Sequence, residues 1–217
     1  MYYFFFIFFC SLILPSCSDD GTSSRNSTPE NPSDTINIGS QIWTSKNLDV
    51  DSFQNGDKIK YVDDYTFLYD TVPMYCYLDF DSTNGKKFGK LYNWYAISDT
   101  RGLAPKGYHI PNNNEWSTLI NFLGGKQDAG CKLKANYGWL KNGNNESKLG
   151  LVPGGYMPMG AVAAYPAGFH GYWWTLSEYD STMSWTIMLW NAENSSCYVE
   201  TLPLYKSSYF YVRCIKD

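Results

Sequence analysis

The segment from Leu151 to Tyr172 constrains the fold of this chain more than any other. It reads L-V-P-G-G-Y-M-P-M-G-A-V-A-A-Y-P-A-G-F-H-G-Y, which is too rich in Gly and Pro for a regular helix or strand. It is also too apolar to remain free in water. We therefore predict a long ordered loop that packs against a core, and binding sites often lie in loops of this kind.

A single clear helix is predicted before this loop, over about residues 112–123. Asn112 and Glu115 have the spacing of a capping box, in which each side chain bonds the backbone N–H of the other residue. Gly124 and Gly125 end the helix. Its apolar stripe recurs at i, i+3, i+4 and i+7 and consists of Trp116, Leu119, Ile120 and Leu123.

Short strands are predicted around the helix and the loop. The pair Gly39-Ser40 between apolar runs indicates a hairpin over 36–43. After the loop, apolar residues alternate over 185–190, 197–202 and 209–214. This alternation places Ile187 and Leu189 on a buried face and Trp190 in solvent. The fold class is therefore a mixed α+β domain with short strands, one clear helix and long ordered loops.

Composition limits the class of partner. Of 217 residues, 44% are apolar and 18% charged, so the chain contains enough apolar surface for a core, which we place in one domain over 36–217. The net charge is −4 and no Lys/Arg cluster is present. Because binding to phosphates requires clustered basic residues, we expect no nucleic-acid partner.

The first sixteen residues are interpreted as a lipoprotein signal peptide. Residues 2–14 are apolar and uncharged, but the run is shorter than the roughly 20 residues that a membrane-spanning helix needs. The following Leu14-Pro15-Ser16-Cys17 resembles a lipobox, although Pro15 is unusual there and no Lys or Arg precedes Arg25. We predict cleavage before Cys17 and lipidation of this cysteine. The alternative is a short membrane anchor with an incidental cysteine.

A polar linker follows the lipid cysteine. Residues 17–35 contain no large apolar residue and are interpreted as a flexible tether. Ser18-Asp19-Asp20 resembles the acidic export signal of Bacteroidetes lipoproteins. That resemblance implies a protein held in the outer membrane by its N-terminal lipid and exposed at the cell surface.

Seven segments together resemble one family, the Fibrobacter succinogenes major paralogous domain. They keep the family order and span almost the whole domain: I-G-S-Q-I-W-T-S-K-N-L (38–48), Y-C-Y-L-D-F-D (75–81), F-G-K-L-Y-N-W-Y-A (88–96), L-A-P-K-G-Y-H-I-P-N-N-N-E-W (103–116), A-G-C-K-L-K (129–134), G-Y-W-W-T-L-S-E-Y (171–179) and Y-V-R-C-I-K-D (211–217).

The resemblance implies a fold but no activity. The P-x-x-x-E-W start of the helix also resembles the formylglycine-generating-enzyme group, which shares the C-type-lectin-like fold. By that analogy the strands at the two chain ends pair and long loops gather on one side. Ala104 stands where the family usually has Cys, and Cys131 and Cys197 are not usual in it. The disulfides of the family therefore do not transfer to this chain.

The sequence gives little support for catalysis. His109 and His170 are the two histidines. His109, at a strand end, is interpreted as structural, and His170 in the long loop is the one placed near a pocket. Neither has zinc-ligand spacing, and no nucleophile or phosphate-binding motif is present. The E-P-N or Q-P-D loop of calcium-dependent lectins is also missing. We expect no metal, no cofactor and no enzyme.

The remaining function classes are binding and structure. We predict a non-catalytic binding or adhesion module, for glycan or for protein, that uses aromatic residues in or beside the long loop. The alternatives are a purely structural surface module and an unrecognised enzyme. The candidate ligand-binding residues are Trp139, Tyr156, Tyr172, Trp190, Asn191 and Glu193.

Four cysteines lie within the domain: Cys76, Cys131, Cys197 and Cys214. In an oxidising compartment an even number favours disulfides. If 197–202 and 209–214 form an antiparallel hairpin, Cys197 and Cys214 lie directly opposite each other, and we favour that pair. The lectin-like resemblance instead implies Cys131 with Cys214. Buried free thiols are the third alternative.

Overall fold

The computed structural model describes residues 34–217 except 66–69, 161 and 191–196. The predicted signal peptide 1–16, Cys17 and almost all of the tether lie outside the described residues. The elements in chain order are β1 (Thr35–Ile38), β2 (Gln41–Thr44), β3 (Lys60–Tyr61), β4 (Met74–Cys76), a 3-10 turn (Leu78–Phe80), α1 (Ser82–Phe88), β5 (Leu91–Tyr92), α2 (Trp94–Ile97), β6 (Tyr108–His109), α3 (Asn113–Phe122), α4 (Ala129–Leu133), β7 (His170–Glu178), β8 (Met183–Trp190), β9 (Val199–Tyr205) and β10 (Ile215–Lys216).

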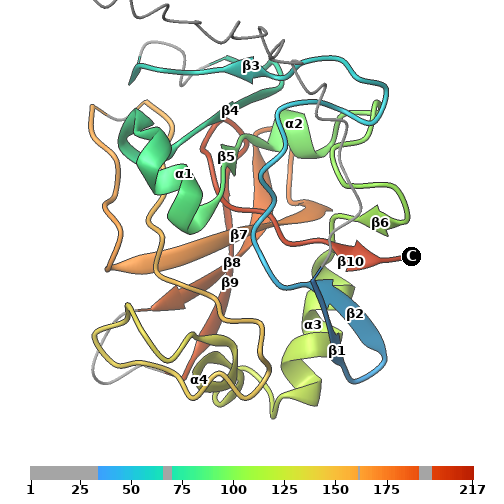
Figure 1. Ribbon diagram of the computed structural model, residues 1–217, viewed down its shortest axis with the longest axis vertical. Coiled ribbons are helices and arrows are strands. Elements are labelled where there is room, and N and C mark those ends of the chain that lie inside the picture. The colour runs from blue at the N-terminus through green and yellow to red at the C-terminus, as the bar shows by residue number, and fades with distance from the viewer. Residues whose placement is uncertain (1–33, 66–69, 161, 191–196) are drawn as a thin grey trace, which may run out of the picture.

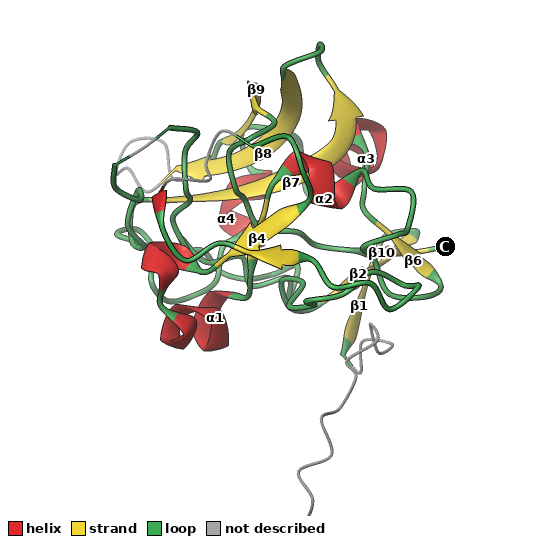
Figure 2. Cartoon of the chain, turned by 90° about the horizontal axis from the view of Figure 1, so that it is seen from above, coloured by secondary structure: helices red, strands yellow, loops and turns green. Residues whose placement is uncertain are grey.

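The described residues form a mixed α+β domain, as the sequence predicts (Figure 1). Its strands make three small sheets, with the orders β1-β2-β10-β6, β3-β4-β5 and β7-β8-β9. Figure 2 shows α1 at one side of the domain and the first of these sheets at the opposite side. Within the part of the chain that the structure describes, no helix combines the length and apolar character needed to span a bilayer.

Strands from the two ends of the chain pair with each other. The predicted hairpin is confirmed: β1 and β2 are antiparallel around Gly39, whose φ of +60° lies in the left-handed region that glycine adopts most easily. β10 then pairs with β2 through Ile215 and Trp43, and with β6 through Ile215 and His109. The expectation that strands from both ends pair is therefore confirmed.

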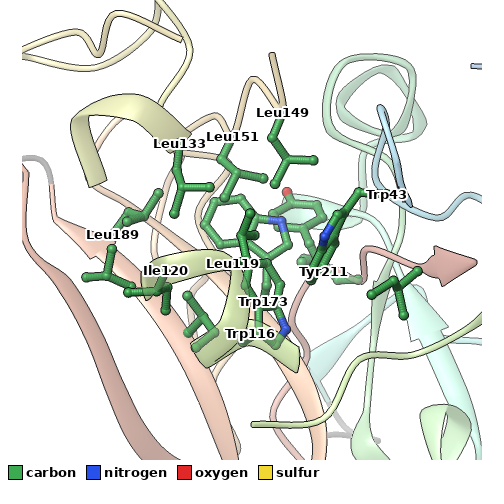
Figure 3. Packing of buried hydrophobic residues seen from close by; sticks show 14 of the residues in the cluster. Trp43, Trp116, Leu119, Ile120, Leu133, Leu149, Leu151, Trp173, Leu189 and Tyr211 are labelled. Atoms are coloured by element: carbon green, nitrogen blue, oxygen red, sulfur yellow. The ribbon is translucent and has the colours of Figure 1, made fainter. Parts of the chain in front are cut away.

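The β7-β8-β9 sheet lies inside the domain, between two apolar clusters. Ile187 and Leu189 are buried on one face, as the alternation predicts, and belong to the cluster that α3 covers (Figure 3). On the other face, Met188 and Trp174 are equally buried in a second cluster with Phe210. Both faces are thus apolar because this sheet has a packing partner on each side.

The prediction that Trp190 faces solvent is only partly correct, for the same reason. Trp190 is half-buried and packs against the second cluster. Its Nε1–H donates to Glu200 Oε2 at 2.6 Å, which fixes the indole against β9. Alternation along β8 distinguishes two faces but does not indicate that one of them is exposed.

The predicted helix is confirmed as α3, and so is its capping box. Asn112 Oδ1 accepts from the backbone N–H of Asn114 at 2.8 Å and of Glu115 at 3.1 Å, while Glu115 Oε2 accepts from Asn112 N–H at 2.8 Å. The stripe beginning at Trp116 is buried, with Trp116 wholly inaccessible. Helix start and core face are therefore both set by local sequence.

The predicted long loop is confirmed except for its last residues, since 170–172 belong to β7. The loop is held by short bridges instead of a ladder. Tyr156 and Tyr165 exchange two backbone hydrogen bonds, and Met157 bridges to Tyr209. These bonds satisfy backbone groups that would otherwise be buried without partners.

The favoured disulfide between Cys197 and Cys214 is wrong, and so is the pairing of Cys131 with Cys214. The structure joins Cys131 to Cys197, with Cα atoms 4.3 Å apart, and leaves Cys76 and Cys214 as buried free thiols. The third alternative, buried free thiols, is therefore correct for Cys76 and Cys214 only.

The pairing of Cys197 with Cys214 fails because the chain that follows β9 does not form a hairpin with it. Instead of returning beside β9, residues 209–212 run parallel to β7, where Tyr211 pairs with Trp173, and antiparallel to Tyr92. Cys214 then bonds to Thr44 at the end of β2. Cys197 lies beside α4, where its carbonyl accepts from Gly130 N–H at 2.7 Å.

We expect the Cys131–Cys197 bond to contribute about 2–4 kcal/mol to the free energy of unfolding, because it closes a long loop in the unfolded chain. The double variant Cys131→Ser/Cys197→Ser should lower the urea midpoint accordingly. A reducing agent should destabilise the wild type and leave this double variant unchanged. Peptide mapping without reduction that joins Cys214 to any cysteine would contradict the pairing.

Candidate functional site

Two adjacent cavities lie where α1 meets the long loop, which runs on the same side of the domain (Figure 1). We call them the α1 groove. The larger, the apolar half, has a volume of about 510 Å³, within the roughly 300–1,000 Å³ of small-ligand sites. Its lining residues include Phe88, Tyr137, Val152, Pro153, Ala167 and Gly168.

The smaller cavity, the polar half, has a volume of about 280 Å³. Lys87, Phe88, Tyr137 and Val152 border both cavities, so the two halves adjoin. Basic side chains outnumber acidic ones on its walls. The polar and charged residues lining it include Lys46, Asn47, Asp49, Lys86, Lys87 and Arg213.

Helix α1 forms one wall because its ends are specified locally. Asp81 caps the N-terminus by accepting from Thr83 N–H at 2.8 Å. Gly89 ends the helix with φ of +82°, and a Cβ there would lie 3.0 Å from the carbonyl oxygen of Leu48. The last turn therefore stops beside the segment after β2, with two lysines in the position that the helix dipole favours.

The opposite wall is mainly apolar, with Tyr137 and Gly138 exposed and Val152 and Pro153 buried. Tyr137 is 64% exposed and borders both cavities. Gly138 beside it and Gly168 of the long loop both have positive φ, and nothing lies within 4 Å of where a Cβ of Gly168 would stand. This wall is therefore open to solvent and to a ligand.

Arg213 borders the polar half from below. Its side chain is buried, with only 3% of the residue exposed. Nε donates to Asn47 Oδ1 at 2.8 Å and Nη1 to the carbonyl of Thr44 at 2.9 Å. Burial lowers the pKa of Arg213 to about 9, so the guanidinium is still charged at neutral pH.

The residues predicted to bind a ligand differ in how deeply the structure buries them. Trp139 is 4% exposed and its Nε1–H donates to the carbonyl of Leu151 at 2.8 Å, so this residue belongs to the core and its assignment to a binding site is wrong. Tyr172 is also buried, at 8% exposed, while Tyr156 and Trp190 are half-buried. Asn191 and Glu193 lie outside the described residues.

Three of the predicted residues are nevertheless brought together. Tyr156 lies 4.5 Å from Tyr172, and His170 contacts both Tyr172 at 6.1 Å and Trp190 at 5.0 Å, all measured between ring centroids. Tyr165, half-exposed, stacks on Tyr156 at 4.7 Å. We call these five residues the loop aromatic cluster. Most of their ring surface is used in packing, which leaves Tyr165 as the accessible ring.

Tyr137, α1 and Arg213 were not predicted from the sequence as parts of a site. The alternation predicted over 209–214 puts Tyr211 and Arg213 on the face opposite Phe210, Val212 and Cys214. Both Tyr211 and Arg213 are in fact buried. The sequence feature that could have pointed to Arg213 was its position as a charged residue within an otherwise apolar run.

The histidines have different environments. His109 lies between two carboxylates, with Nε2 2.7 Å from Glu115 Oε1 and Nδ1 2.7 Å from Asp217 Oδ1. It thereby links α3 to the C-terminal segment, as expected for a structural residue. His170 Nδ1 is buried and makes no hydrogen bond within the described part of the chain, and burial lowers its pKa. Among the described residues no group of His, Cys, Asp or Glu is arranged to hold a metal ion.

Fold and site define this chain as a small mixed α+β module with an open, partly apolar surface groove. A family model, the Fibrobacter succinogenes major domain, matches residues 36–216, and the chain belongs to this family. No curated protein matches the chain, and no solved structure does.

The His109 contacts predict a pH-dependent contribution to stability. Burial alone would lower the pKa of His109, but the hydrogen bonds to Asp217 and Glu115 and their charge raise it above the ordinary value. A raised folded-state pKa means that the contribution is complete below about pH 6.5 and is lost as pH rises through the folded pKa.

We therefore expect His109→Gln to lower the free energy of unfolding by up to about 1 kcal/mol at pH 5.5, and by less at pH 8.5, since the pair is partly exposed. Urea unfolding of both proteins at the two pH values measures the difference. A difference that grows with pH would contradict this assignment.

Proposed function

We propose that this chain is a lipid-anchored surface module that binds glycans in the α1 groove. The observation that carries the proposal is the exposed ring of Tyr137, which borders an apolar and a polar cavity at once. A pyranose has the same duality, with C–H groups on its face and hydroxyl groups at its edge. A flat ring and flanking polar groups therefore suit a sugar better than a purely apolar ligand.

The anchor follows from the sequence of the leader. Residues 2–14, the lipobox-like run ending at Cys17 and the polar tether to residue 35 support lipidation and export to the cell surface. A tether of this kind separates the domain from the bilayer, which leaves the α1 groove accessible to large ligands.

We further propose that the fold is a variant of the C-type-lectin-like fold. The pairing of β10 with β2, the single long helix α3 and the irregular loop before β7 support this relation. Since the calcium-binding loop of those lectins has no counterpart in the sequence, glycan binding should persist in EDTA.

Substitution of Tyr137 tests the proposed site. Full-length protein in detergent is applied to a glycan array, and affinity for the best ligand is then measured by calorimetry. Tyr137→Ala should weaken binding about threefold to tenfold, through loss of ring stacking. Tyr179→Ala removes a similarly exposed tyrosine at the end of β7 and should have no effect.

Two results of this experiment contradict the proposed site. A loss of affinity on Tyr165→Ala but not on Tyr137→Ala would move the site to the loop aromatic cluster. An array with no ligand above background would favour the alternative, a purely structural surface module.

Lipidation is tested separately. Cells that express Cys17→Ser should accumulate a precursor with an uncleaved leader that takes up no labelled fatty acid, because the thiol is the acceptor. Cys10→Ser, within the apolar run of the leader, is the matched control and should process normally. Unchanged label in Cys17→Ser would show that Cys17 is not the lipidated residue and that the lipobox interpretation is wrong.

A further inference from the structure

Arg213 is a buried cation without an anionic partner in the described part of the chain. Buried charges are normally paired, because the cost of removing a charge from water is large. The two hydrogen bonds that Arg213 donates end on an amide and a backbone carbonyl, both neutral. No carboxylate of a described residue forms an ion pair with it, so the guanidinium keeps an uncompensated positive charge.

The guanidinium also has donors to spare. It carries five N–H groups, and the two hydrogen bonds employ Nε and Nη1. Nη2 makes no hydrogen bond to a described residue, while Arg213 itself borders the polar half of the groove. An unpartnered donor of this kind, on a buried side chain at a cavity wall, is suited to a ligand that accepts hydrogen bonds.

The surrounding charges favour an anion. Lys86 and Lys87 in the last turn of α1 line the same cavity, as does Lys46. Lys46 has only an exposed contact with Asp34, at 3.6 Å. The acidic residue of the cavity, Asp49, is already bound to Lys90 Nζ at 2.6 Å. The polar half therefore has a net positive potential, which attracts anions.

We propose that the polar half of the α1 groove is a carboxylate subsite, so that the ligand is an acidic glycan carrying a uronic acid. This inference rests on the proposed function. The sugar ring lies against Tyr137 and Phe88 in the apolar half, and its carboxylate meets Arg213, whose planar fork matches that group, with Lys87 at the rim.

The test compares an acidic with a neutral oligosaccharide. Full-length protein in detergent is titrated with a galacturonate trisaccharide and with the galactose trisaccharide of the same linkage. The acidic ligand should bind about tenfold to a hundredfold more tightly, as expected for a charge-assisted hydrogen bond, and this preference should fall with added salt.

Variants of the residues that line the polar half test whether this cavity causes the preference for the acidic ligand. Arg213→Lys should remove most of the preference for the acidic ligand, because an ammonium group cannot reproduce the planar guanidinium contacts. Because a buried variant can fail to fold, the exposed Lys87→Ala provides a second measure and should reduce the preference severalfold. Lys106→Ala removes an exposed lysine outside the groove and is the matched control, with no change expected.

Four other outcomes would each overturn part of the proposal. Equal affinity for both trisaccharides, with Tyr137→Ala still weakening each, overturns the carboxylate subsite and leaves the proposed function standing. Equal binding of a sulfated galactose trisaccharide overturns selectivity for carboxylate. Tighter binding of a peptide with a free C-terminal carboxylate overturns the glycan in favour of a protein partner. Binding of none of these ligands refutes the proposed function itself.

Discussion

The side chain of Asn47 holds the domain together at the point where four distant segments meet. Its Nδ2 donates to the carbonyl of Phe88 at the end of α1, and its Oδ1 accepts from Trp173 Nε1 and Arg213 Nε, at 2.7, 2.9 and 2.8 Å. One amide thus joins the segment after β2 to α1, to the β7-β8-β9 sheet and to the last residues of the chain. Because Asn47 is only partly buried, these three hydrogen bonds are the main link that its side chain provides between the four segments.

The position of the α1 groove follows from that junction. Asn47 and Arg213 form its base, and the end of α1 forms its wall, because the same hydrogen bonds place them there. The apolar floor comes from the long loop, which is fixed from the other side by Tyr211, whose hydroxyl donates to the carbonyl of Gly154 at 2.8 Å. The groove is therefore preformed, and a ligand need not order the backbone around it.

Local features of the sequence were predictable, and features that depend on tertiary partners were not. The capping box at Asn112 involves residues three positions apart and the Gly39 hairpin pairs residues at most nine positions apart, and both predictions were correct. The course of the chain after β9 depends on a partner strand, β7, more than thirty residues earlier, so the hairpin that would pair Cys197 with Cys214 was wrong. The alternation along β8 showed which residues share a face of the strand. It did not show that both faces are buried, because the second apolar cluster is assembled from separate segments of the chain. Trp139 was assigned to a binding site for the same reason: aromatic residues in β-rich sequence are mostly core, as Trp139 is, and the exposed Tyr137 has no sequence signature.

The register of the first hairpin has a mechanical consequence. Thr35, where the tether joins the domain, is paired with Thr44 at the open end of the hairpin, and Thr44 in turn holds Arg213 under the groove. In the lipid-anchored, ligand-bound state that we propose, tension between tether and ligand would enter at this open end, so the cross-strand bonds of β1 would be loaded one after another instead of all at once. β1 is an edge strand bonded to β2 alone, so it can peel away while the pairing of β2 with β10 stays intact. Peeling of β1 would then lengthen the proposed tether under load before force reaches a ligand in the groove.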